Sequence, residues 1–156
     1  MAGTEFTVST GAIASTASAN DALTVQANAN IGFIVNRVTV SIEDLGSETG
    51  KALIEVAQCT PAPVTGGSEL TEVATGGDSD TPTVESREEP TGGISGQVVV
   101  SEKFWPITAQ SSCIFDFSAL IGRPLKINGG GCLLVRFTGP AGATNSKYTV
   151  VVKGEE

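Results

Sequence analysis

Hydrophobic and polar residues alternate along several short segments of the chain, with the period of two that is typical of a half-buried β-strand. In residues 31–42 the aliphatic residues at positions 34, 38, 40 and 42 share one face, while Arg37 and Ser41 lie on the other. Phe33 and Val35 extend the apolar character to the second face near the start of this segment. The pattern predicts a long strand that begins inside a contact region.

The same kind of pattern returns in residues 97–100, 112–117, 132–137 and 147–153. In the last of these, Tyr148, Val150 and Val152 are predicted to face inward. Turns rich in Gly and Pro separate the segments, as in the Asn-Gly-Gly-Gly run at 128–131. Eight to ten short strands at this spacing, with no helix of useful length, predict an all-β sandwich or barrel.

Residues 51–59 (KALIEVAQC) fit two patterns. Leu53, Val56 and Ala57 would share one face of a short amphipathic helix. Ala52 and Val56, together with the residue at position 54, would share one face of a strand. We favour the strand because Gly at position 50 weakens a helix start and the neighbouring segments are strands.

Residues 1–20 are rich in Thr, Ser, Ala and Gly, and after Met1 their large apolar residues are Phe6, Val8 and Ile13. A segment of this composition cannot form a core of its own. We therefore expect residues 1–20 to form an extended, flexible N-terminal arm, which is either frayed or ordered on a neighbouring molecule. Residues 21–156 are then predicted to form the β-sandwich domain.

Residues 60–95 carry much of the charge of the chain. They hold seven acidic residues against one base, Arg87, whereas the whole chain has a net charge of −8. Three Gly-Gly pairs and four prolines interrupt this segment. Because a structureless loop of this length is unusual in a compact domain, we expect a short exposed strand near residues 83–87 within a long, solvated acidic excursion.

Length, charge and cysteine content narrow the class of protein further. A chain of 156 residues without an internal repeat fits one domain. The acidic balance disfavours nucleic acids and anionic membranes as partners, and residues 1–20 have no features of a signal peptide. Cys59, Cys113 and Cys132 lie in apolar runs without Cys-x-x-Cys spacing, so we interpret them as small apolar strand residues of a reducing compartment, in preference to a metal site or a redox pair.

The chain contains no histidine, so it lacks the commonest general base and cannot form a Ser-His-Asp or Cys-His site. Two acidic clusters could be argued as a catalytic carboxylate pair: Glu85 with Glu88 and Glu89, or Asp78 with Asp80. The second also begins like a calcium loop, but the remaining ligands of that motif are missing. Both clusters lie in the Gly- and Pro-rich excursion, so we interpret them as solvated charges. The sequence thus predicts a non-enzymatic protein without a metal or cofactor site.

Phe104 and Trp105 are adjacent aromatic residues in a chain that has eight aromatics. They could anchor a protein interface, stack on a sugar, or cover one end of the core. We favour core use, because the chain has only eight aromatic residues and a carbohydrate-binding face usually presents several exposed ones.

The order of the segments resembles that of a known class of virion proteins. The segments are IVNRVTVSIEDLG, ALIEVAQCTPAPVTGG, TPTVESREEPTGG, GGGCLLVRFTGP and the final YTVVVKGEE. Over roughly residues 30–156 this layout resembles the jelly-roll head decoration, or cement, proteins of tailed phages. The resemblance implies a jelly-roll β-sandwich without an active site, which is often a homotrimer and binds the major capsid protein on the outer surface of the head.

The resemblance also implies a location on the virion, after assembly in the host cytoplasm. The residues that could then contact capsid protein or a sister subunit are Phe6, Val8, Ile13, Phe104 and Trp105. Two other classes remain open from the sequence: a carbohydrate-binding or host-attachment module, and a tail or baseplate component.

Overall fold

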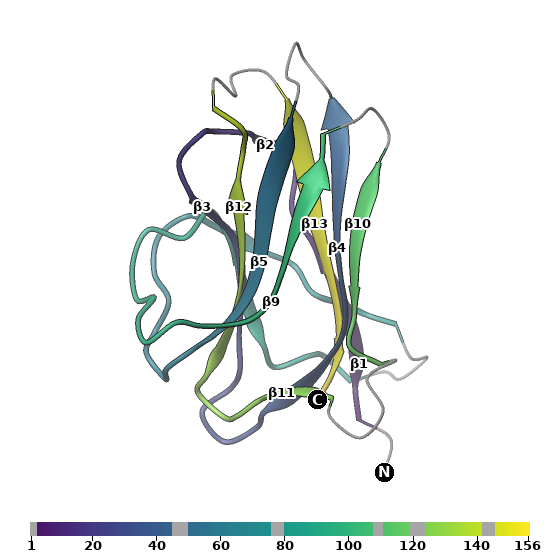
Figure 1. The fold of residues 1–156 in the computed structure, drawn as a ribbon. Coiled ribbons are helices and arrows are strands. Elements are labelled where there is room, and N and C mark those ends of the chain that lie inside the picture. Colours follow the sequence, from purple (N-terminus) through teal and green to yellow (C-terminus); the bar gives the residue numbers. More distant parts are fainter. Residues whose placement is uncertain (1–2, 45–49, 76–79, 108–110, 119–123, 142–145) are drawn as a thin grey trace.

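The computed structural model describes residues 3–44, 50–75, 80–107, 111–118, 124–141 and 146–156, and this part contains β-strands and no helix. The strands form two antiparallel sheets that pack face to face (Figure 1). The predicted all-β, single-domain β-sandwich is therefore confirmed, and residues 51–59 are a strand, as favoured above.

Seven strands form the larger sheet, and six form the smaller one. The larger sheet has the order β10 (Ser112–Asp116), β4 (Phe33–Asp44), β13 (Lys147–Glu155), β1 (Glu5–Ser9) and β7 (Val73–Ala74), with β11 (Leu125–Ile127) also paired to β4 and β2 (Ile13–Ala14) also paired to β13. The smaller sheet has the order β6 (Ser68–Leu70), β8 (Glu85–Glu88), β3 (Asn20–Gln26), β12 (Cys132–Thr138), β5 (Lys51–Cys59) and β9 (Val98–Pro106).

The main strands pair in a nested way. β1 pairs with β13, β3 with β12, β4 with β10, and β5 with β9. The two outermost of these strands in the sequence pair with each other, and so does each next pair further inward along the chain. The arrangement is that of one long hairpin folded over into two sheets. This nested antiparallel pairing is the strand arrangement of a jelly roll.

The core lies between the two sheets, where the predicted inward faces meet. Tyr148 of the larger sheet stacks on Phe137 of the smaller one, with ring centroids 3.9 Å apart and planes inclined by 12°. The Tyr148 hydroxyl accepts a hydrogen bond of 3.2 Å from Asn20 Nδ2. Burial of its ring raises the pKa of Tyr148 well above its ordinary value. The inward faces predicted for residues 147–153, and for the strand at 51–59, are confirmed.

A bulge in β4 corrects the prediction made for its start. Between Arg37 and Val35 the pairing with β13 shifts by one residue, which leaves Asn36 without a direct partner on β13. An extra residue of this kind reverses which side chains face the core. Phe33 and Val35 therefore join the core together with Val38, and they do not form a second apolar face.

The N-terminal segment is part of the larger sheet, which corrects the expectation of a flexible arm over residues 1–20. From residue 5 onward, β1 pairs along its whole length with β13, and β2 pairs with the start of the same strand. Phe6 packs edge-on against Phe33, with ring centroids 5.6 Å apart. The three large apolar residues of this segment do not need a core of their own, because the two sheets supply one. Residues 1 and 2 lie outside the described part.

The acidic excursion also packs more closely than its composition predicts. It contributes β6, β7 and β8 to the sheet edges, and β8 at Glu85–Glu88 corresponds to the predicted short strand. Val84 enters the main core. Val64 and Ile94 cover the outer face of the smaller sheet, where they form a second apolar cluster with the following residues of β5 and β12: Ala57, Cys59, Cys132 and Leu134. In Figure 1 the loops of this segment run beside β3 and β12.

Candidate functional site

Exposed apolar side chains gather at one edge of the sandwich. Within the described residues, seven large hydrophobic side chains are exposed, and five of them lie on β9 and β10. These five, which we call the β9 edge, are Val98, Val99, Val100, Phe104 and Ile114. A cluster of this kind on a soluble protein is typical of an interaction surface.

The β9 edge lies where both sheets end. β9 is the last strand of the smaller sheet, and β10 is the last strand of the larger sheet. Although they belong to different sheets, the two strands come into contact here. Lys103 of β9 spans the gap, since its Nζ donates a hydrogen bond to the carbonyl of Ile114 and lies 4.9 Å from the centroid of the Phe115 ring. The two strands are therefore in contact, with Phe104 on the outer face of the smaller sheet and Ile114 on the outer face of the larger one.

Two features of β9 oppose the addition of another strand to its free side. The pairing with β5 shifts between Ser101 and Val99, which makes Val100 the extra residue of a bulge. Lys103 lies opposite the core residue Ile54, so a charged side chain points inward on an edge strand. Bulges and inward charges are the means by which natural edge strands avoid edge-to-edge pairing. The β9 edge is thus suited to contact through side chains and not through sheet extension.

The two adjacent aromatic residues of β9 serve different purposes. Phe104 has 66% of its surface exposed and lies on the outer face, opposite Leu53. Trp105 faces the other way, packs against the core, and donates a hydrogen bond of 3.3 Å from Nε1 to the Ser111 hydroxyl. Phe104 remains a candidate contact residue, whereas Trp105 covers the end of the core.

The structure places the other three predicted contact residues away from any surface. Phe6, Val8 and Ile13 are buried between the sheets. A partner could reach them only if β1 left the sheet, so they are removed from the candidate site. The sequence carried a signal for the exposed valines of β9, because QVVV at 97–100 is a run of three valines without alternation, but the run was interpreted as an ordinary strand.

The acidic residues that could form a carboxylate pair have separate surroundings. Glu88 Oε2 accepts a hydrogen bond from the Gly11 amide, and Glu89 Oε1 accepts one from Asn20. Glu85 instead lines a pocket on another side of β8. Asp80 is exposed, and Asp78 lies outside the described residues. The described part brings none of these carboxylates together in one cleft.

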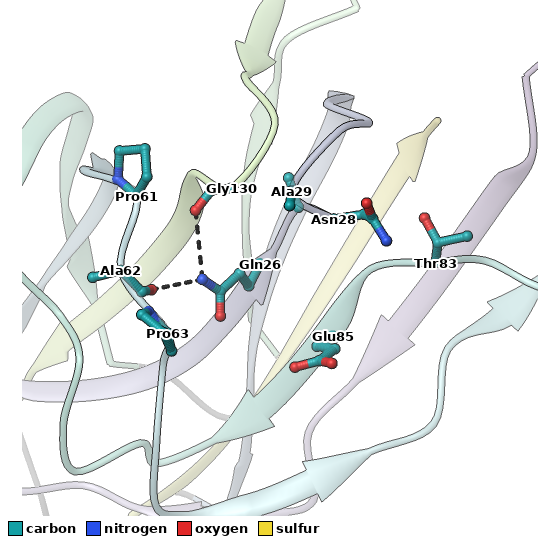
Figure 2. Close-up of a pocket in the computed structure, with 10 residues that line it drawn as sticks. Gln26, Asn28, Ala29, Pro61, Ala62, Pro63, Thr83, Glu85 and Gly130 are labelled. Atoms are coloured by element: carbon teal, nitrogen blue, oxygen red, sulfur yellow. Dashed lines mark hydrogen bonds between the residues drawn. The ribbon is translucent and has the colours of Figure 1, made fainter.

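A pocket of about 400 Å³ lies beside β3 and the start of the excursion (Figure 2). Its walls are largely small side chains and backbone, and Glu85 is the ionisable group among its lining residues. The amide of Gln26 is used internally, because Nε2 donates to the carbonyls of Ala62 and Gly130 while Oε1 accepts from the Val64 amide. These bonds hold the excursion against β3, so we interpret the pocket as a structural junction between the excursion and β3.

Across the described ranges, no three Cys, Asp or Glu side chains lie close enough together to hold a metal ion. In the same part of the chain, no helix has the length and apolar character needed to cross a membrane. No protein-family model matches the chain, and no curated protein or solved structure gives a significant match.

Proposed function

We propose that this chain is a structural module that binds other protein surfaces through the β9 edge. The observation that carries the proposal is the concentration of exposed valines and Phe104 on the terminal strand β9, with Ile114 on the neighbouring terminal strand β10. Burying such side chains against a partner is favourable by roughly 25 cal/mol per Å² of apolar surface. Exposed aromatic residues such as Phe104 are also enriched at the centres of protein interfaces.

Our specific proposal is a decoration protein of a tailed-phage head, which binds the major capsid protein as a homotrimer on the outer surface of the virion. Two observations support it. The segment order resembles that protein class, and the nested strand pairing is the jelly roll that the resemblance implies. A symmetric shell also compensates for a small contact, because many weak contacts act together.

The exposed aromatic residues favour protein docking over carbohydrate binding. All eight aromatic residues fall within the described ranges, and among these Phe104 alone is largely exposed. A sugar-stacking platform usually presents several such rings.

The location of the chain on the virion and the surface through which it binds can be tested separately. Electron microscopy of purified virions, labelled with an antibody against the chain, should place it on the head surface. Label on tails or baseplates would replace the decoration role with another virion role, and unlabelled virions would overturn both. Light scattering on the free chain should give the molar mass of a trimer.

Lysine substitutions test the β9 edge itself. Val98→Lys and Phe104→Lys should lower the amount of chain bound to heads, because each places a charge in the proposed contact. Val73 on β7 offers a matched control, since it is a valine of similar exposure (57% against 63% for Val98) far from β9 in the sheet order. Val73→Lys should bind like the unmodified chain. Equal loss in all three variants would show that the β9 edge has no special role.

A further inference from the structure

Two of the three cysteines are direct neighbours in the smaller sheet, although they lie far apart in the sequence. Cys59 ends β5 and Cys132 begins β12, and the two residues are opposite partners in the antiparallel pairing of these strands. Residues that are directly opposite point to the same face of a sheet. Here that face is the outer one, beneath the excursion, where both cysteines belong to the second apolar cluster.

The position of this pair meets the geometric requirement for a disulfide. Opposite residues of antiparallel strands have Cα atoms about 4.5–5.5 Å apart. A disulfide requires Cα atoms about 4.4–6.8 Å apart. The thiol of Cys132 donates a hydrogen bond of 3.3 Å to the Leu133 carbonyl. Both thiols are free in this structure.

We propose that Cys59 and Cys132 form a redox modification site, at which a small-molecule disulfide such as glutathione disulfide oxidises the two thiols to an intramolecular disulfide. The inference concerns the chemistry of the sheet and does not rest on the proposed function. For Cys59 and Cys132, it replaces the interpretation of the cysteines as inert apolar side chains.

The structure gives the two cysteines different roles in this exchange. Cys59 has 8% of its surface exposed and Cys132 has 1%. A cavity of about 120 Å³, lined by both residues and by Lys126, opens beside them. The neighbouring Cys132 thiol lowers the pKa of Cys59, whereas the Cys59 thiol and burial raise the pKa of Cys132. Cys59 is therefore the attacking thiolate and Cys132 the resolving thiol.

The exchange proceeds in two balanced steps. The Cys59 thiolate attacks one sulfur of glutathione disulfide, which forms a mixed disulfide and releases one glutathione thiolate. Cys132 then gives up its proton and attacks the Cys59 sulfur, which forms the Cys59–Cys132 bond and releases the second glutathione. The two protein thiols lose two electrons and two protons, and the oxidant becomes two glutathione thiols.

Cys113 supplies an internal control. It lies on β10 in the other sheet, where its opposite partner is Val40 and it is fully buried. Desolvation by burial raises the pKa of its thiol, and Lys103 opposes that shift. A buried protonated thiol without a cysteine neighbour in its sheet pairing should stay reduced under conditions that oxidise the pair.

Peptide mapping of the full chain tests the proposal. The folded chain is incubated with glutathione disulfide, quenched in acid, unfolded, alkylated with iodoacetamide, and digested without reduction. The expected product is a linked peptide pair containing Cys59 and Cys132, with Cys113 alkylated. Alkylation of both Cys59 and Cys132, or a stable glutathione adduct on Cys59 of the unmodified chain, would overturn the proposal.

Two cysteine variants and a denaturing condition test whether the folded sheet directs the exchange. Cys113→Ser should give the same linked peptide as the unmodified chain. Cys132→Ser should instead accumulate glutathione on Cys59, because the resolving thiol is missing. In concentrated urea, the preference for the Cys59–Cys132 pair over pairs with Cys113 should be lost. If that preference is unchanged in urea, or if Cys132→Ser forms no adduct, the folded sheet is not what directs the exchange.

Discussion

Truncation of Phe6 distinguishes a core strand from an arm that docks on a neighbour. The Phe6 ring is fully buried in the isolated chain and packs edge-on against Phe33. Gly154 on the paired strand leaves room for the ring, since a Cβ at that position would lie 2.6 Å from Phe6 Cζ. Replacing a buried Phe by Ala costs about 3–5 kcal/mol. Phe6→Ala should therefore lower the free energy of unfolding by about that amount.

Urea unfolding of the isolated chain measures this loss against a matched control. With a slope of about 2 kcal/mol per M for a small domain, the midpoint of Phe6→Ala should fall by roughly 2 M. Phe104→Ala removes the same atoms from an exposed site and should change stability by no more than about 0.5 kcal/mol. Phe6→Leu keeps most of the volume and should lie between the two. Equal midpoints for Phe6→Ala and Phe104→Ala would refute the placement of β1 in the core.

Two further predictions concern the same core. Burial raises the pKa of Tyr148, so its contribution to stability is complete below the unfolded pKa of about 10 and is lost as the pH rises from there toward the folded pKa. Stability measured from pH 9 upward should thus fall less steeply in Tyr148→Phe, and identical slopes would contradict this account. Gly154→Ala forces a Cβ against Phe6 and should cost about 1–3 kcal/mol in thermal unfolding. Gly11→Ala, whose Cβ would meet nothing closer than 3.6 Å, should cost distinctly less.

The alternating segments could be predicted from sequence because a single rule governs them. In β13 every second residue faces the core, so the pattern alone gives the strand and its buried face, whereas β5 also needed its neighbours to decide between a strand and a helix. In β4 the bulge at Asn36 reverses that alternation midway. A bulge is set by the pairing with β13, which is remote in sequence, so the local pattern of β4 could not reveal it.

Composition misled the prediction in the two regions that lack alternation. Residues 1–20 have too few apolar residues to form a core, but Phe6, Val8 and Ile13 fill one that other strands build. The excursion is acidic as a whole, yet Val64 and Ile94 fasten it to the outer face of the smaller sheet. Both outcomes depend on tertiary contacts, which average composition does not describe.

The candidate sites also combine a feature that the sequence could predict with features that depend on tertiary structure. Phe104 could be selected from its residue type, whereas the exposure of the valines before it depends on β9 being an edge strand. The Cys59–Cys132 pair depends on the register of β5 and β12. Neither property is encoded in the spacing of residues along the chain.

Hydrogen–deuterium exchange of the chain seated on purified virions, compared with the free chain, tests the central claim most directly. The account predicts that exchange slows in peptides covering residues 98–106 and 112–116 when the chain is bound. Peptides covering residues 68–74 at the opposite ends of the two sheets should exchange equally in both states. Protection of residues 68–74, with residues 98–106 unchanged, would contradict docking through the β9 edge.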